Sequence, residues 1–178
     1  MNVPRVIRRL FRRPYDGLRH LGTVAPERLY RCGQPRPADL AELVRRFGLR
    51  TVVSLRGARE DEDPDAWEDE ERAACAAAGA QFVTLPFNHK NPPTPAQAGA
   101  FLDLCTAADR QPVLVHCRLG QQRTLLFCAL YRVHVEHADP DAAEREMDAL
   151  GFNAGHRRHQ KLLAAYRALA RTPRAELR

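Results

Sequence analysis

The stretch PVLVHCRLGQQRTLLFCALYRV, residues 112–133, joins two apolar runs through a polar loop. PVLVH, residues 112–116, has the continuous apolar character of a strand that is covered on both faces of a sheet. LLFCALYRV, residues 125–133, has the composition of a buried helix. The loop HCRLGQQRT, residues 116–124, therefore follows the carboxyl end of a strand, which is where α/β sheets bind ligands.

The same alternation of short strands and helices recurs on both sides of this stretch. The sequence predicts two strands with a turn over 22–34, strands at 51–55 and 81–86, and helices over 37–47, 63–79, 94–105, 139–151 and 156–171. The runs at 51–55 and 81–86 have the composition of buried strands. We therefore predict a single α/β domain with a central, mostly parallel sheet of four to five strands and helices on both faces.

The ends of the chain differ from its middle in composition. We expect a basic segment at 1–21, the folded domain at 22–172 and a short tail at 173–178. Residues 1–13, MNVPRVIRRLFRR, place apolar residues at helical spacing against five arginines. They are interpreted as a terminal helix docked on the domain, or alternatively as contact with an anionic membrane surface. The docked helix is preferred because so short a segment binds lipid only marginally.

Composition limits the classes of function. The chain has 178 residues, a formal charge of +6 and only 7% aromatic residues, without the basic and aromatic cluster that nucleic-acid binding requires. No apolar run reaches the 18 residues of a membrane span. Five cysteines with no C-x-x-C spacing argue against a disulfide framework and a structural zinc site, so we expect a reducing, cytoplasmic location. The acidic run 60–71 is interpreted as the solvated start of a helix.

The quoted loop carries residues that suit an oxyanion. A loop that turns from a strand into a helix aims successive backbone N–H groups at one point, and the helix adds its positive end. Gly120 allows close backbone approach, and Arg123 can hold two phosphate oxygens in a bidentate fork. The same field lowers the pKa of a thiol, so Cys117 is the expected nucleophile, with Thr124 donating a hydrogen bond to its sulfur. His116 is expected to orient the loop through backbone hydrogen bonds.

The other four cysteines lie among apolar neighbours without basic residues beside them. We expect them to be ordinary buried thiols; they are Cys32, Cys75, Cys105 and Cys128.

HCRLGQQRT resembles the phosphate-binding loop of the cysteine-dependent protein tyrosine phosphatase superfamily. LYRCGQP (29–35) and TVVSLRG (51–57) are similar to segments of the small atypical dual-specificity phosphatases of plants, fungi and bacteria. The resemblance covers about residues 22–170 and implies hydrolysis of phosphate esters through a phosphocysteine intermediate, without a metal or cofactor. The implied partners are phosphorylated proteins or small phosphate-bearing metabolites.

Site residues follow from this resemblance position by position. It implies that Cys117 is the nucleophile, Arg123 the phosphate clamp and Thr124 the assisting hydroxyl. The phosphate-binding ring of amides is implied for Arg118, Leu119, Gly120, Gln121 and Gln122. Arg31 and Arg56 match basic positions that either border the pocket or form structural ion pairs.

The chain departs from the family at the general acid. The family usually draws an aspartate from the loop after the preceding strand, but FNHKNPPT, residues 87–94, contains no carboxylate. His89 is the nearest titratable candidate, and Asp61 or Asp63 could serve if the acidic segment folds over the site. A third reading needs no strong acid, because phenolates and phosphoanhydrides leave more readily than alkoxides. The expected preference is then for aryl phosphates and anhydrides over phosphoserine.

Three alternatives remain open from the sequence. Some relatives act on inositol polyphosphates or pyrophosphates, although the loop here offers Arg118 beside the neutral Gln121 and Gln122. A rhodanese-like sulfurtransferase is disfavoured because its loop is typically one residue shorter between cysteine and arginine. A non-catalytic phosphate-binding module is disfavoured by the intact cysteine, arginine and threonine.

Overall fold

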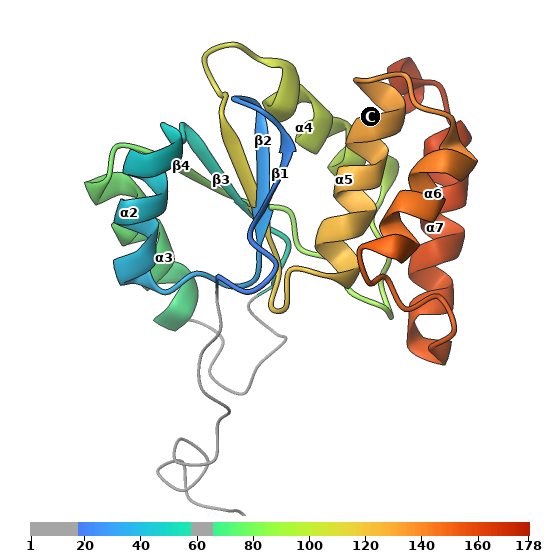
Figure 1. The fold of residues 1–178 in the computed structure, drawn as a ribbon, viewed down its shortest axis with the longest axis horizontal. Helices are drawn as coiled ribbons and strands as arrows, with labels where there is room; N and C mark the ends of the chain where they lie inside the picture. Colours follow the sequence, from blue (N-terminus) through green and yellow to red (C-terminus); the bar gives the residue numbers. More distant parts are fainter. Residues whose placement is uncertain (1–17, 58–65) are drawn as a thin grey trace, which may run out of the picture.

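The computed structural model describes residues 18–57 and 66–178, and its centre is one five-stranded sheet. The strands are β1 (Gly22–Ala25), β2 (Leu29–Cys32), β3 (Thr51–Ser54), β4 (Gln81–Thr84) and β5 (Val113–His116). Their order across the sheet is β1-β2-β5-β3-β4, with β1 antiparallel to β2 and every other pair parallel (Figure 1). The predicted mostly parallel α/β sheet is confirmed.

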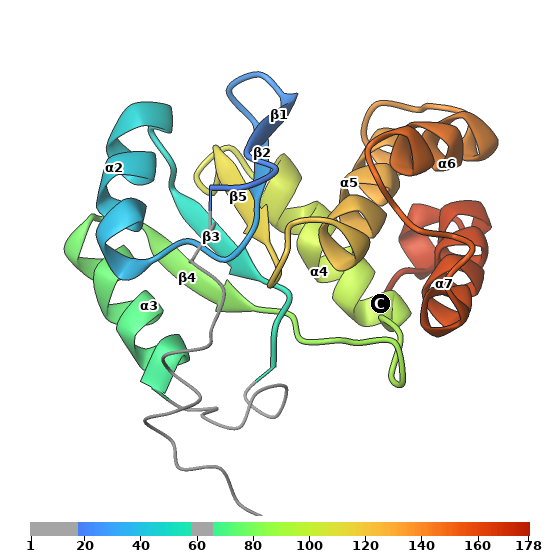
Figure 2. The ribbon, with the colours of Figure 1, turned by 60° about the horizontal axis from the view of Figure 1, so that its bottom comes forward.

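Helices cover both faces of the sheet. The helices α2 (Pro37–Phe47) and α3 (Ala66–Ala77) pack on one face, while α4 (Pro95–Thr106) and α5 (Gln122–His134) pack on the other (Figure 2). Outside α5 lie α6 (Pro140–Ala149) and α7 (Gln160–Arg171), with short 3₁₀ turns at Arg157–His159 and Arg174–Glu176. All six α-helices of the described residues overlap the ranges that the sequence predicts.

Helix starts and stops follow from local chemistry. The Thr94 hydroxyl accepts from the Gln97 amide at the start of α4, and the Gln97 side chain accepts from the Thr94 amide. At the start of α6, the Asp139 carboxylate accepts from the Ala142 amide at 2.8 Å. Gly48 ends α2 in the left-handed conformation, with φ of 60°.

Strand β5 occupies the centre of the core. All four of its residues are fully buried, because helices cover the strand from both faces. Val113 and Val115 belong to the cluster beneath α4 and α5, while Leu114 belongs to the cluster beneath α2 and α3. This alternation fixes the register of β5 in the sheet. The position of His116, from which the next loop begins, is therefore fixed as well.

Strand β4 differs from its sequence-based interpretation. Its apolar run predicts a buried strand, but β4 lies at the edge of the sheet, where Gln81 is exposed and Val83 is half-buried. An apolar run does not encode the order of strands in a sheet, which arises from the crossovers.

Two further predicted features fall outside the described residues, namely the amphipathic segment 1–13 and the helix cap at Asp63 and Pro64. Glu71 departs from the predicted solvated acidic run, because it is only 1% exposed.

The last residues pack on the domain. Leu177, in the segment expected as a short tail, is 3% exposed, and its carbonyl lies against Gly99 of α4. Within 18–57 and 66–178, no helix combines the length and apolar composition that a bilayer span requires. The same described residues contain no cluster of three histidine, cysteine or acidic side chains that could hold a metal ion.

Candidate active site

The loop between β5 and α5 bends back over the end of the sheet. Gly120 has φ of 70°, and a Cβ at this position would lie 2.4 Å from the Gly33 nitrogen and 2.5 Å from the Cys32 carbonyl carbon. The Gln34 amide donates to the Arg118 carbonyl at 3.2 Å. The segment that follows β2 therefore supports the loop from below, and only glycine permits so close an approach.

Cys117 lies at the base of this loop and is 3% exposed. Burial raises the pKa of its thiol, but the Arg123 guanidinium, the Thr124 hydroxyl and amide and the Leu119 amide together hold that pKa below its ordinary value. The Thr124 hydroxyl is fully buried and finds no nitrogen or oxygen partner among the described residues. Its interaction with the Cys117 sulfur is one of the causes that lower the pKa of that thiol.

The remaining cysteines behave as expected for buried thiols. Burial raises the pKa of Cys75 and Cys128 to about 12 and raises that of Cys32 and Cys105 as well. Thiolate chemistry near neutral pH is therefore confined to Cys117.

Arg123 is held in a fixed orientation by the ends of two strands. Its Nη1 donates to the Leu55 carbonyl at 3.1 Å, just after β3, and to the Phe87 carbonyl at 3.2 Å, beyond β4. Backbone acceptors on both sides pre-organise the guanidinium beside the thiol, so little side-chain entropy is lost when an oxyanion arrives.

A cavity of about 380 Å³ opens above the thiol. It is lined by Asn88, His89, Lys90, Cys117, Arg118, Leu119, Gln122, Arg123, His159 and Leu162. Three segments far apart in sequence therefore meet here: the loop after β4, the loop after β5 and the start of α7. The lining carries several basic side chains and no carboxylate among the described residues, as an anion-binding site requires.

Arg56 and Arg31 do not line this cavity. Arg56 is 5% exposed, lies 4.2 Å over the Trp67 ring and donates to the Gln34 side chain at 2.7 Å. Arg56 therefore links α3 to Gln34, the residue whose amide supports the phosphate-binding loop. Arg31 instead lines a separate cavity of about 110 Å³ beside α5 and α6 and donates to the His20 carbonyl at 3.1 Å.

His116 is held by its side chain as well as by its backbone. Its Nε2 lies 2.9 Å from the Glu71 carboxylate of α3, and both side chains are buried. The His116 carbonyl accepts from the Leu55 amide at 2.9 Å. The expected backbone role is present, and the buried carboxylate partner adds a contact that the sequence did not reveal.

The sequence offers two sources for the general acid, namely His89 and the aspartates at 61 and 63. His89 reaches the cavity, but partial burial and then the charges of Arg158 and Lys90 lower the pKa of its imidazole. Asp61 and Asp63 lie outside the described residues.

The α6–α7 loop and the first turn of α7 supply residues that sequence reasoning missed. His159 and Leu162 form one wall of the cavity, although no motif surrounds them. Gln122 connects this loop to the phosphate loop, since its Nε2 donates to the Gly151 carbonyl at 3.3 Å and its Oε1 accepts from the Asn153 amide at 3.0 Å.

A doubly covered, mostly parallel sheet, with a cysteine in the loop after its central strand and an arginine in the first turn of the next helix, is the arrangement of the cysteine-based phosphatases. Within this class, a family model described as "DSP-PTPase phosphatase fused to NAD+ Kinase" matches residues 19–165. The chain belongs to this family.

Named relatives agree with this assignment. The chain is 36% identical over 125 residues to the dual specificity protein phosphatase TpbA of Pseudomonas aeruginosa strain UCBPP-PA14, covering 70% of this chain and 51% of the relative. It therefore spans about half the length of the curated relatives it matches.

Solved structures show the same fold. A crystal structure of P. aeruginosa TpbA matches with a TM-score of 0.62 and 30% identity, covering 85% of this chain and 88% of that one. A TpbA structure in complex with pTyr matches with a TM-score of 0.60 and 28% identity, covering 90% and 96%. The catalytic domain of the S. cerevisiae PP-IP phosphatase SIW14, 18% identical, shares the fold with a TM-score of 0.65 over 84% and 86%.

Proposed function

We propose that this chain is a cysteine-dependent phosphatase that hydrolyses phosphate monoesters, phosphotyrosine first among them, through a phosphocysteine intermediate. The observation that carries the proposal is the lowered pKa of Cys117 beside the anchored guanidinium of Arg123. A thiolate beneath an oxyanion-binding fork is the arrangement that lets one anion attack another.

In the first half of the reaction, the Cys117 thiolate attacks phosphorus and the bond to the leaving oxygen breaks. Arg123 and the amides of 118–122 bind the three non-bridging oxygens and follow them as they become equatorial. In the second half, water attacks the phosphocysteine and the thiolate leaves. Thr124 then stabilises the departing sulfur through the hydrogen bond that already lowers the pKa of the free thiol.

The substrate class follows from the leaving group and the relatives. The cavity has no described carboxylate to protonate an alkoxide, so we propose faster turnover of aryl phosphates than of phosphoserine. The relative TpbA is named a dual specificity protein phosphatase, and one of its crystal structures is a complex with pTyr. Both names support aryl phosphates as substrates. The proposed reaction needs no cofactor.

The proposed location is the cytoplasm. All five cysteines are free thiols, which supports a reducing compartment, and the nucleophile must stay reduced to work.

The test is hydrolysis of p-nitrophenyl phosphate, with and without EDTA, by wild type, Cys117→Ser and the matched control Cys128→Ala. We expect activity in wild type and control that EDTA leaves unchanged, and at least about a thousandfold loss in Cys117→Ser. Retention of activity by Cys117→Ser, or thiosulfate sulfurtransfer faster than phosphate release, contradicts the proposal.

A second candidate substrate is a small polyanionic metabolite such as an inositol polyphosphate or a phosphoanhydride. The observation that favours it is the placement of Lys90 and Arg118 on the cavity wall beside Arg123. The measurement is kcat/KM for a panel of these metabolites and of phosphotyrosine peptides. A higher kcat/KM for one of the metabolites supports this second candidate.

A further inference from the structure

The cavity contains two imidazoles that could move a proton, and they come from opposite walls. His89 belongs to the loop after β4, where the family usually places its acid, and His159 belongs to the start of α7. No described lining residue is a carboxylate, so the described groups on the cavity wall that can give a proton to the leaving group are the two imidazoles and Lys90.

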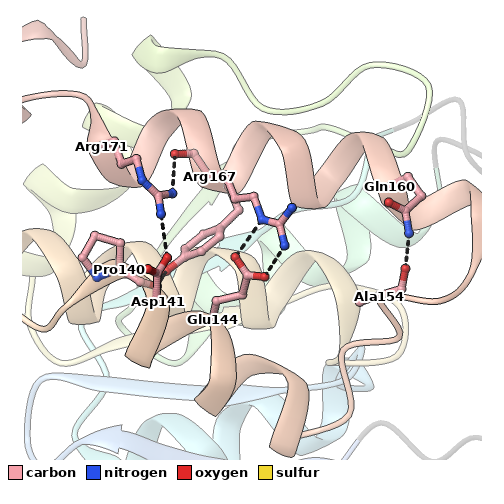
Figure 3. A network of polar contacts seen from close by, with 8 residues as sticks. Pro140, Asp141, Glu144, Ala154, Gln160, Arg167 and Arg171 are labelled. Atoms are coloured by element: carbon pink, nitrogen blue, oxygen red, sulfur yellow. Dashed lines mark hydrogen bonds and ion pairs between the residues drawn. The ribbon is translucent and has the colours of Figure 1, made fainter.

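The loop that carries His159 is held at several points. Gln122, next to the phosphate clamp, hydrogen-bonds Gly151 and Asn153 at the start of the loop. Gln160 then donates its side-chain amide to the Ala154 carbonyl (Figure 3). A group held this closely to the phosphate loop keeps a constant position relative to bound phosphate, which proton transfer requires.

The helices behind the loop are also fixed to each other. Arg167 of α7 forms a two-pronged ion pair with Glu144 of α6 at 2.6 and 2.9 Å, and Arg171 pairs with Asp141 at 2.6 Å (Figure 3). The Tyr166 hydroxyl donates to the Pro140 carbonyl at 2.8 Å. The C-terminal half of α7, the helix that follows His159, is therefore anchored to α6.

The ring of His159 has a defined tautomer. Its Nδ1 lies 2.9 Å from the Asn153 carbonyl oxygen, and because a carbonyl only accepts, Nδ1 carries a proton. Nε2 is then the nitrogen that carries no proton in the neutral ring. The centroid of the His159 ring lies 4.7 Å from that of His156 and 6.0 Å from that of Phe152, so contacts with two neighbouring rings set its orientation.

His89 is less suited to the same task. Burial, and then the charges of Arg158, Lys90, His159 and Arg123, lower the pKa of its imidazole, which reduces the protonated fraction near neutral pH. The His159 ring, in contrast, is held by a hydrogen bond from its Nδ1 and by two ring contacts. The charged and titratable groups around His159 are His89 and Lys90 after β4, Arg118 and Arg123 of the phosphate loop and α5, and His156 and Arg158 of its own loop.

We propose that His159 is the general acid, donating a proton from Nε2 to the leaving oxygen; this inference rests on the proposed phosphatase function. As the sulfur of Cys117 bonds to phosphorus, the P–O bond to the leaving group breaks and the proton moves from the imidazolium to that oxygen. The neutral ring next takes a proton from the attacking water while the S–P bond breaks and its electron pair returns to sulfur. The enzyme is restored, with alcohol and inorganic phosphate as products.

The test compares two substrates that differ in their need for a proton. Phenol has a pKa of about 10, like tyrosine, and leaves poorly as an anion, whereas nitrophenolate leaves without help. We expect His159→Gln to lose about 100-fold in kcat/KM for phenyl phosphate and less than about threefold for p-nitrophenyl phosphate. The fall of wild-type kcat/KM for phenyl phosphate with rising pH should disappear in this variant.

Matched variants separate the proton donor from a structural role. Arg157→Gln alters the same loop at an exposed residue that does not line the cavity, and it should change both substrates by the same small factor. Equal losses on both substrates in His159→Gln, or a selective loss in His89→Gln instead, overturn the assignment. Hydrolysis of neither substrate by the wild type overturns the proposed function itself, which is a distinct result.

Discussion

Gly120→Ala tests whether the phosphate loop depends on its close contact with the segment after β2. A Cβ on Gly120 would lie 2.4 Å from the Gly33 nitrogen and 2.6 Å from the Cys32 oxygen, and these backbone atoms have no flexible end that could yield. The left-handed conformation adds about 1–2 kcal/mol for any residue with a Cβ. Overpacking of backbone against backbone adds about 1–3 kcal/mol.

We therefore expect Gly120→Ala to lower the free energy of unfolding by about 2–5 kcal/mol. Gly48→Ala is the matched control, because Gly48 is also left-handed at φ of 60° but its added Cβ meets nothing within 4 Å. The control should lose only the conformational part, about 1–2 kcal/mol. The difference between the two variants measures the contact alone.

The assay is urea unfolding of both variants, with equal m-values as the check that the two-state comparison holds. Activity provides a second readout: a loop displaced by about 1 Å should lose about 100-fold in kcat/KM in Gly120→Ala, whereas Gly48→Ala should match wild type. A Gly120→Ala variant that is as stable as the control and fully active refutes the reasoning.

Three further predictions concern the surroundings of the loop. Glu71→Ala removes the buried partner of His116 and should lower the free energy of unfolding by about 3 kcal/mol. In the control Glu70→Ala, which changes an exposed side chain, the free energy of unfolding should change by less than about 0.5 kcal/mol. Both are measured by urea unfolding, and equal effects contradict the buried pair. Because the pKa of Cys117 is lowered, its thiolate forms at a lower pH than that of an ordinary thiol. Iodoacetamide at pH 7 should therefore label Cys117 before any other cysteine, as measured by peptide mass spectrometry. Earlier labelling of another cysteine contradicts this prediction. Gly99→Ala would place a Cβ 1.9 Å from the Leu177 carbonyl oxygen and should release the chain end, seen as faster amide hydrogen exchange at Leu177; unchanged exchange contradicts the packing.

Local patterns in the sequence were sufficient for most of the fold. The continuous apolar run of β5 and the caps at Thr94, Asp139 and Gly48 are local signals, and the structure confirms the elements that they mark. The prediction that β4 is a buried strand was wrong, because β4 lies at the edge of the sheet and strand order depends on long-range crossovers.

The site divides in the same way. Cys117, Arg123 and Thr124 lie within one short stretch that runs from the loop after β5 into the first turn of α5, so their spacing alone predicts that they come together. His159 enters the cavity only because α6 and α7 pack together and Gln122 holds their connecting loop, and no short-range pattern contains that information. Glu71 looked like part of a solvated acidic run, and only the packing of α3 beside His116 reveals it as buried.

The most direct test of the central claim is rapid-quench mass spectrometry of the enzyme during turnover of p-nitrophenyl phosphate. The account predicts a phosphoryl group on the peptide that contains Cys117, formed in a burst and lost as the phosphoenzyme hydrolyses. Phosphate release without any adduct at Cys117, or an adduct on another residue, contradicts it.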